Sequence, residues 1–273
     1  EKNNNEIQKS IDYLRKKGLA KASKKSSRIA NEGAVGVFFD KDKTLLIEIN
    51  TETDFVAKND LFLNFIEKIA NYALQIKDEI ELDISNFMEK EFDGKKISEL
   101  FTEIIAKIGE NVVLKRFKLL NEDSKTKIFT YTHNVYKKNI GKICVALKTE
   151  IDTSDKNTST LGKNLCMHIA ALKPISIDIN NLDSNFVEKE KAIQLETIKS
   201  SGKPDNIISK ILEGKMKKLF SEITLLNQKY VLDDEKTVKE VISNFNSRDG
   251  KFKIVDFTLF ILGSWWIKIQ GYF

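Results

Sequence analysis

The sequence has few of the residues that build catalytic or metal centres. Its 273 residues include only two histidines and two cysteines. His133 and His168 have no cysteine, serine or second histidine at a spacing that would build a catalytic triad or a zinc site. Cys144 and Cys166 stand in apolar surroundings without a C-x-x-C spacing, which is typical of buried thiols in a reducing compartment. The sequence therefore predicts no metal site and no catalytic residues.

Phosphate-binding loops and long apolar runs are also missing. Neither G-x-x-x-x-G-K-[ST] nor G-x-G-x-x-G occurs, so we expect no nucleotide cofactor. The longest apolar stretches, such as 257–267, are interrupted before the roughly 18 to 20 residues that a membrane span needs. The chain opens with a polar run at 1–5 and not with a signal peptide, which predicts an intracellular protein with no membrane partner.

Proline is scarce and the charge is nearly balanced. Only two prolines occur, and long stretches have helical periodicity, so helix is expected to dominate. Lys and Arg number 45 against 40 Asp and Glu, and the two signs are interleaved instead of forming the basic patch of a nucleic-acid binder. The basic stretch at 21–28 is either a nucleic-acid-binding arm or a solvated helix or connector.

The first half of the chain shows a pair of strands followed by a helix. Residues 35–39 and 45–49 are rich in strand formers around a polar turn at 40–43, which predicts a β-hairpin. Apolar residues from Phe62 to Ala73 then recur at i, i+3, i+4 and i+7, which predicts an amphipathic helix. Side-chain oxygens at 51–54 are suited to capping that helix.

The order strand, strand, helix returns later in the chain. Further elements are expected in this order: a helix at 97–107 ended by Gly109, strands at 112–120, 127–133 and 141–148, and a helix at 161–172. Residues 69–74 also resemble residues 168–172. The sequence therefore suggests a degenerate internal repeat of two sheet-plus-helix units.

Two further helices form a separate pattern near residue 200. Helices are expected at about 186–199 and 205–226, joined by a short connection with Gly202 and Pro204. Such a connection favours antiparallel packing, and the helices carry too many polar residues to be buried on more than one face. We therefore predict an antiparallel helical hairpin that protrudes. Another short helix is expected at 6–16.

Together these patterns predict an α+β protein with two related sheet-plus-helix subdomains in tandem. Residues 1–30 are expected to hold the amino-terminal helix and a linker. The first core subdomain is expected at 31–134 and the second at 135–273, with the helical hairpin inserted at about 186–226.

The segment Thr53-Asp54-Phe55-Val56-Ala57-Lys58-Asn59 resembles the hallmark segment of the elongation factor Ts family. Further matches follow in the family's order over nearly the whole chain: 17–22, 32–33, 107–111, 131–133 with Gly141, 167–171 with Pro174, 201–204, 213–218 and 236–238. The resemblance implies that residues 1–30 are what is left of a three-helix docking module. The tail around Trp265 and Trp266 departs from the family's pattern.

The resemblance also implies a function. Members of this family are non-enzymatic guanine nucleotide exchange factors that bind GDP-bound elongation factor Tu, disturb its magnesium site and promote GDP release during translation elongation. The residues implied at the magnesium site of the partner are Thr53, Asp54, Phe55 and Val56. Other implied partner contacts are Ile108, Gly109 and His133 with the GTPase domain, and Met167, His168, Ala171, Val231 and Leu232 with another domain. No direct nucleic-acid contact is implied, and the location is the cytoplasm or, alternatively, an organelle of bacterial descent.

Other interpretations of the same residues stay open at this point. Phe55 precedes Phe62 by seven residues and could share its helical face as a core residue. His133 and His168 could be ordinary packed or surface histidines. The protein could instead bind nucleic acid or the ribosome through 21–28 and 215–218, which would make its affinity strongly salt-dependent. An enzyme of unidentified type is the third hypothesis, although no convergent site supports it.

Overall fold

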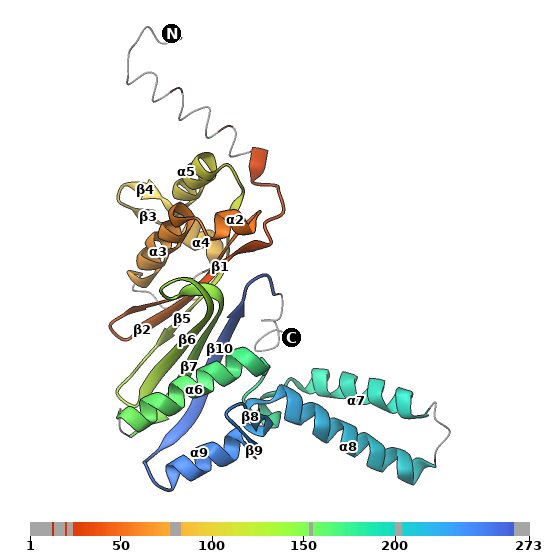
Figure 1. The fold of residues 1–273 in the computed structure, drawn as a ribbon. Coiled ribbons are helices and arrows are strands. Elements are labelled where there is room, and N and C mark those ends of the chain that lie inside the picture. Colours follow the sequence, from red (N-terminus) through yellow and green to blue (C-terminus); the bar gives the residue numbers. More distant parts are fainter. Residues whose placement is uncertain are drawn as a thin grey trace. The chain divides into compact units, whose positions relative to one another are not determined.

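The computed structural model describes residues 13, 20, 24–76, 83–152, 155–199 and 204–264 (Figure 1). It shows an α+β fold with an antiparallel main sheet, as the sequence predicts. Several predictions lie outside the described residues: the helix at 6–16, the first part of the basic stretch at 21–28, the connection at 200–203, and the Trp265-Trp266 tail.

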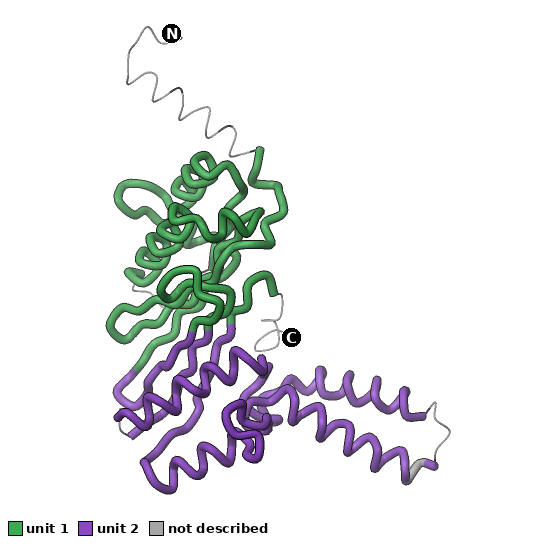
Figure 2. Tube along the Cα trace, in the orientation of Figure 1, with its two compact units in different colours: residues 1–122, 132–144, 260–264 green, residues 123–131, 145–259, 265–273 purple. Residues whose placement is uncertain are grey.

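The chain divides into two compact units that alternate along the sequence (Figure 2). Unit 1 comprises residues 1–122, 132–144 and 260–264, and unit 2 comprises residues 123–131, 145–259 and 265–273. Three strands contribute residues to both units: β6 (Thr126–Lys137), β7 (Ile140–Ile151) and β10 (Phe252–Ile261). The border expected between residues 134 and 135 falls inside β6, and the subdomain borders stay a prediction.

The main sheet is built around the predicted hairpin, which lies in unit 1. Strands β1 (Glu32–Asp40) and β2 (Lys43–Thr51) pair antiparallel, and β2 also pairs with β5 (Val112–Asn121). The strand order is β10-β7-β1-β2-β5, with β6 paired to β7. The expected strands at 35–39, 45–49 and 112–120 are therefore confirmed, because their apolar residues line a buried sheet.

The helices of unit 1 cover this sheet with apolar side chains. Phe62, Ile66 and Ile69 of the long amphipathic helix are fully buried in a common core with Ile47 and Ile49 of the sheet. The described helices are α2 (Asp54–Ala57), α3 (Asp60–Leu74), α4 (Ile84–Glu89) and α5 (Ile97–Ile108), and a small hairpin joins β3 (Glu91–Phe92) to β4 (Lys95–Lys96). The helix predicted at 97–107 and its end at Gly109 are confirmed.

A buried ion pair fastens the end of β10 within unit 1. Glu48 is fully buried on β2, and its carboxylate lies 2.6 Å from the Arg116 guanidinium on β5. The Gly263 N–H donates to the same carboxylate at 3.0 Å, and Arg116 lies over the ring of Phe260 with 4.3 Å to its centroid. Loss of one partner of this buried pair would leave the other charge unpaired.

Unit 2 contains α6 (Lys156–Leu172), which begins five residues before the predicted start at 161. The reason is a cap: the Asp155 carboxylate accepts the Thr158 N–H at 2.7 Å, so polar residues that looked like a loop form the first turn. Gly162 lets this helix approach Phe129, because a Cβ there would lie 2.3 Å from the ring. The strands predicted at 127–133 and 141–148 are confirmed as parts of β6 and β7.

The remaining elements of unit 2 include the two helices predicted near residue 200. Helices α7 (Ser184–Lys199) and α8 (Asp205–Ile223) lie side by side and share a small core of Ile198, Ile208 and Met216 (Figure 1). The others are η1 (Ile179–Asn181), η2 (Leu225–Asn227), β8 (Lys229–Tyr230), β9 (Asp233–Thr237) and α9 (Val238–Asn246).

Candidate functional site

The Phe55 ring faces solvent from a very short helix. At 84% exposure Phe55 is the most exposed large hydrophobic residue in the described part of the chain. Helix α2 ends at Ala57, and a separate helix begins at Asp60 after Asn59 caps it through the Leu61 N–H. Phe55 therefore does not continue the face of Phe62, and the interpretation of Phe55 as a core residue is wrong.

Helix α2 is held in place by its flanking residues. It has four residues, which is too few for a helix to be stable without tertiary contacts. Thr53 caps it by accepting the Val56 N–H at 3.4 Å, Ala57 is fully buried, and Val56 packs partly against the core of unit 1. These anchors leave Phe55 as the side chain of α2 that points outward.

A charged pair accompanies the exposed ring. The Lys58 ammonium donates to the Asp54 carboxylate at 3.0 Å, and this hydrogen bond holds the pKa of Asp54 below its usual value. The same contact raises the pKa of Lys58. Both side chains are exposed, so the pair contributes little to stability. Its consequence is that a carboxylate stays ionised beside an apolar ring.

Ile108 and Gly109 lie next to this helix, as the end of α5. Gly109 adopts the left-handed conformation with a φ of 85°, and its N–H donates to the Ile105 carbonyl at 2.9 Å. The following residue, Glu110, accepts hydrogen bonds from Thr53. The structure therefore brings together two predicted segments, Thr53 to Val56 and Ile108-Gly109, that are far apart in the sequence.

His133 belongs to the same unit and is exposed on β6. The paired strand approaches it closely, because a Cβ at Gly141 would lie 2.7 Å from the His133 carbonyl oxygen. Tyr136, on the same strand, packs against the core of unit 1, as Val56 of α2 does. His133 is thus on the surface of the unit that carries Phe55.

The second predicted set lies in unit 2, on α6 and on the turn between β8 and β9. Ala171 is exposed and Met167 is half-buried on α6. Val231 and Leu232 are 45% and 56% exposed at the turn. These four residues present an apolar surface to solvent.

His168 differs from its neighbours because it is fully buried. Its Nδ1 accepts the Val231 N–H at 3.1 Å, and its Nε2 lies 3.0 Å from the Gln228 side-chain oxygen. The imidazole is therefore neutral with its proton on Nε2, in keeping with a pKa that burial lowers. The ring lies inside unit 2, where it holds the Val231 turn. A direct contact between His168 and a partner stays a prediction.

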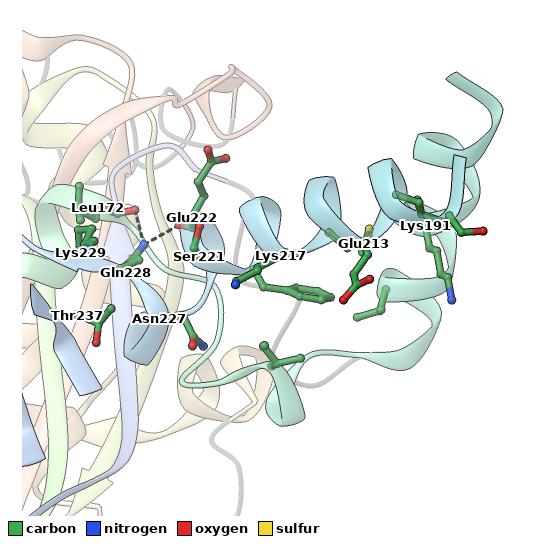
Figure 3. Close-up of a pocket in the computed structure, with 16 residues that line it drawn as sticks. Leu172, Lys191, Glu213, Lys217, Ser221, Glu222, Asn227, Gln228, Lys229 and Thr237 are labelled. Atoms are coloured by element: carbon green, nitrogen blue, oxygen red, sulfur yellow. Dashed lines mark hydrogen bonds between the residues drawn. The ribbon is translucent and has the colours of Figure 1, made fainter. Parts of the chain in front are cut away.

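Gln228 extends this buried network to two further backbone carbonyls. Its Nε2 donates to the carbonyl of Glu222 at 2.7 Å and to that of Leu172 at 3.3 Å (Figure 3). The network links the end of α6, the end of α8 and the β8–β9 turn. The exposed Val231-Leu232 pair therefore stands on a rigid, buried support.

Beside this network, unit 2 has a groove of about 1250 Å³ (Figure 3). Apolar side chains of η1, α7 and α8 line much of it: Ile179, Val187, Leu212, Met216 and Phe220. Its polar lining includes Lys191, Glu213 and Lys217, and among the described residues neither a histidine nor a cysteine lines it.

The comparisons with known proteins all point to one family. A family model described as Elongation factor TS matches residues 52–264, which is well over half of the chain. The chain belongs to the elongation factor Ts family. It is 36% identical over 258 residues to elongation factor Ts of Gluconobacter oxydans, and 41% identical over 259 residues to that of Rickettsia felis. Each alignment covers 94% of this chain and 82% of the relative.

A third member of the elongation factor Ts family, from Paracoccus denitrificans, is 40% identical over 237 residues, which cover 87% of this chain and 77% of the relative. All the predicted site residues, from Thr53 to Leu232, lie inside the range that the family model matches. Membership of the family supports a nucleotide exchange role in translation elongation.

The described residues were also searched for metal-binding groups, reactive thiols and membrane-spanning helices. No group of three or more His, Cys, Asp and Glu side chains in these ranges could hold a metal ion. Cys144 and Cys166 are buried, and burial raises the pKa of the Cys144 thiol to about 12. None of the described helices is long and apolar enough to cross a membrane.

Sequence reasoning missed one residue of the site, Glu110. A carboxylate just after the end of a helix is unfavourable next to the negative end of the helix dipole, so it indicates that the side chain has a partner elsewhere. The partner is Thr53, 57 residues away along the chain, and no local pattern predicts that contact.

Proposed function

We propose that this protein is a guanine nucleotide exchange factor that binds GDP-bound elongation factor Tu, disturbs the partner's magnesium site and promotes GDP release. The observation that carries the proposal is Phe55, an 84% exposed ring on an anchored helix beside the ionised Asp54. A large exposed aromatic side chain on a firmly held segment is typical of a residue that becomes buried in a partner.

The ring would enter an apolar pocket of the GTPase, and Asp54 would lie near its magnesium ion. Burial of a phenylalanine ring contributes about 1.5 to 3 kcal/mol. A shift of a two-state equilibrium by a factor of about 10⁴ needs about 5.5 kcal/mol of differential binding, so Phe55 is insufficient alone. We propose that Ile108, Gly109 and His133 supply further contacts with the same domain.

The second surface would contact another domain of elongation factor Tu. Met167, Ala171, Val231 and Leu232 are the residues proposed for it, supported by their exposure in unit 2. His168 acts there indirectly, through the turn that it holds. The bacterial relatives favour the bacterial cytoplasm over an organelle of bacterial descent as the place of action.

Exchange of this kind requires no covalent chemistry in this protein. If binding of the factor weakens GDP affinity for elongation factor Tu, then GDP weakens binding of the factor by the same ratio. The incoming nucleotide therefore releases the factor, which returns to another GDP-bound GTPase. The proposal accordingly assigns no catalytic residue, no cofactor and no direct nucleic-acid contact.

The test is stopped-flow release of a fluorescent GDP from elongation factor Tu. The parent protein is expected to accelerate release, and Phe55→Ala to reduce the acceleration about thirtyfold, the effect of losing about 2 kcal/mol at an interface hot spot. Asp54→Ala is expected to reduce it as well.

Phe39→Ala is the matched control, since Phe39 is a 50% exposed phenylalanine of the same unit. It is expected to retain the parent activity. Equal rates for the parent, Phe55→Ala and Asp54→Ala would refute the assigned site. A protein that acts on RNA would instead show no acceleration and an RNA affinity that falls steeply with salt.

A further inference from the structure

Glu110 joins the two segments of the first candidate surface through three hydrogen bonds. Its Oε1 accepts the Thr53 hydroxyl at 2.7 Å. Its Oε2 accepts the Thr53 N–H at 3.0 Å and the Thr51 hydroxyl at 2.9 Å. One carboxylate at the end of α5 therefore holds the residues that lead directly into α2.

A second carboxylate makes the reverse connection. Glu52, which stands between the two threonines, accepts the Asn111 N–H at 2.7 Å. The Asn111 side-chain amide donates in turn to the carbonyls of Ser26 and Arg28, at 3.2 and 2.7 Å. Each segment thus supplies a carboxylate that accepts a backbone N–H of the other, so the two segments are held in one orientation.

This connection matters because α2 has little stability of its own. A four-residue helix depends on its surroundings for its direction, and Phe55 is only two residues beyond Thr53. On its other side α2 is followed by Lys58, which is exposed, and by the cap of the next helix. The hydrogen bonds of Glu110 are therefore the polar contacts that set how the start of α2, and with it the exposed ring, is directed.

We infer that Glu110 is a positioning residue for Phe55, which keeps the ring directed outward in the orientation that nucleotide exchange requires. The inference rests on the proposed function and goes beyond it, because Glu110 is half-buried and acts through Thr53 instead of contacting the partner. A directed ring needs no rearrangement on binding, so less free energy is lost in ordering it.

The first experiment measures GDP release with Glu110→Ala, Phe55→Ala and the double variant. Glu110→Ala is expected to lower the maximal release rate about tenfold, as for loss of a hydrogen bond to a charged group. The concentration that gives half of the maximal rate is expected to change much less, since the other contacts remain. When Phe55→Ala is already present, Glu110→Ala is expected to change the maximal release rate by less than about twofold. The effects of two substitutions that act through one contact are not additive.

Two variants serve as controls. Glu110→Gln keeps a carbonyl that accepts the Thr53 N–H, and its amide can donate to a rotated threonine hydroxyl, so it is expected to restore most of the rate. Glu99→Ala removes an exposed carboxylate from the other end of α5 and is expected to retain the parent rate. A general loss of stability would not explain both results, namely a rate restored by Glu110→Gln and an effect of Glu110→Ala that disappears when Phe55→Ala is present.

The second experiment reads the orientation without the partner. A nitroxide spin label on Phe55→Cys reports the mobility of position 55, and the two native cysteines are fully buried and do not compete for the label. The label is expected to be more mobile when Glu110→Ala is added, and to be unchanged by Glu99→Ala.

The outcomes separate the two claims. If the parent protein does not accelerate GDP release, the proposed function fails, while the label still decides whether Glu110 orients position 55. If the parent and Phe55→Ala behave as proposed, but Glu110→Ala leaves the label unchanged or multiplies the effect of Phe55→Ala, the positioning role is overturned.

Discussion

The two candidate surfaces are built alike but supported differently. Each presents apolar side chains on a short segment, and each segment is held by polar side chains. Glu110 holds the start of α2 from a half-buried position, whereas His168 holds the Val231-Leu232 turn from inside unit 2. A half-buried carboxylate can exchange its partners for water at modest cost, but a fully buried imidazole cannot. The comparison teaches that the first surface can be altered with little loss of stability, while the second is continuous with a core.

The largest expected effect is on the free energy of unfolding, which should differ between variants of the two surfaces. His168→Ala should lower the free energy of unfolding of unit 2 by about 3 kcal/mol, because it leaves a cavity and deprives the Val231 N–H and Gln228 of their partner. Phe55→Ala should change it by less than about 0.5 kcal/mol, since the ring is exposed. Urea unfolding of both variants measures the difference.

His133→Ala is the matched control for that experiment, since it removes an exposed histidine. It should behave like Phe55→Ala and not like His168→Ala. If His168→Ala unfolds at the same urea concentration as the parent, the imidazole does not support the turn, and the contrast between the two surfaces is lost.

A smaller effect distinguishes what the two surfaces contribute to exchange. The double change Val231→Ser and Leu232→Ser should raise the concentration of factor needed for half-maximal GDP release about tenfold, because two partly exposed apolar side chains lose burial worth about 1.4 kcal/mol. The maximal rate should change little, in contrast to Phe55→Ala, which lowers it. Titration of the factor in the stopped-flow assay measures both quantities.

Val255→Ser provides the control, as an exposed valine of unit 2 outside both surfaces. It should leave both quantities unchanged. Should the double variant lower the maximal rate and leave half-saturation unaltered, the second surface would act on the nucleotide site and not on affinity.

The sequence was sufficient for the elements whose apolar residues repeat. The β1–β2 hairpin followed from two runs of strand formers around a polar turn, and α3 followed from its 3.6-residue apolar spacing. The start of α6 was missed because Asp155 caps a polar first turn that has no apolar pattern. The break between α2 and α3 was missed for a similar reason, since the Asn59 cap is a single side chain.

The candidate surfaces were predicted from a resemblance, and their supports were not predicted at all. Glu110 meets Thr53 across 57 residues, and His168 meets Val231 across 63. Such contacts depend on how strands and helices pack in three dimensions, so neither periodicity nor a local motif contains them. For His168 a packed histidine was one of the open interpretations, but its two hydrogen-bond partners could not be read from the sequence.

The smallest expected effect uses pH to separate the supports. Burial lowers the pKa of His168 below its usual 6.5, so between the two values the unfolded chain binds more protons than the folded one. The stability of unit 2 should therefore be complete above pH 6.5 and fall as the pH drops below it, by at most about 1.4 kcal/mol per pH unit. The Asp54 carboxyl, whose pKa Lys58 lowers, stays ionised over this interval.

Urea unfolding at pH 7.5 and 5.5 tests this with His168→Gln as the control, because glutamine can accept the Val231 N–H but does not titrate. The parent should lose stability at the lower pH by more than the variant does. Protonation places a hydrogen on Nδ1, which then cannot accept the Val231 N–H. The protection of the Val231 amide from exchange, relative to its intrinsic rate at each pH, should therefore fall at pH 5.5 in the parent alone. If the parent and the variant lose equal stability at pH 5.5, the pH dependence comes from groups other than His168. The pH would then not distinguish the His168 support from the Glu110 support.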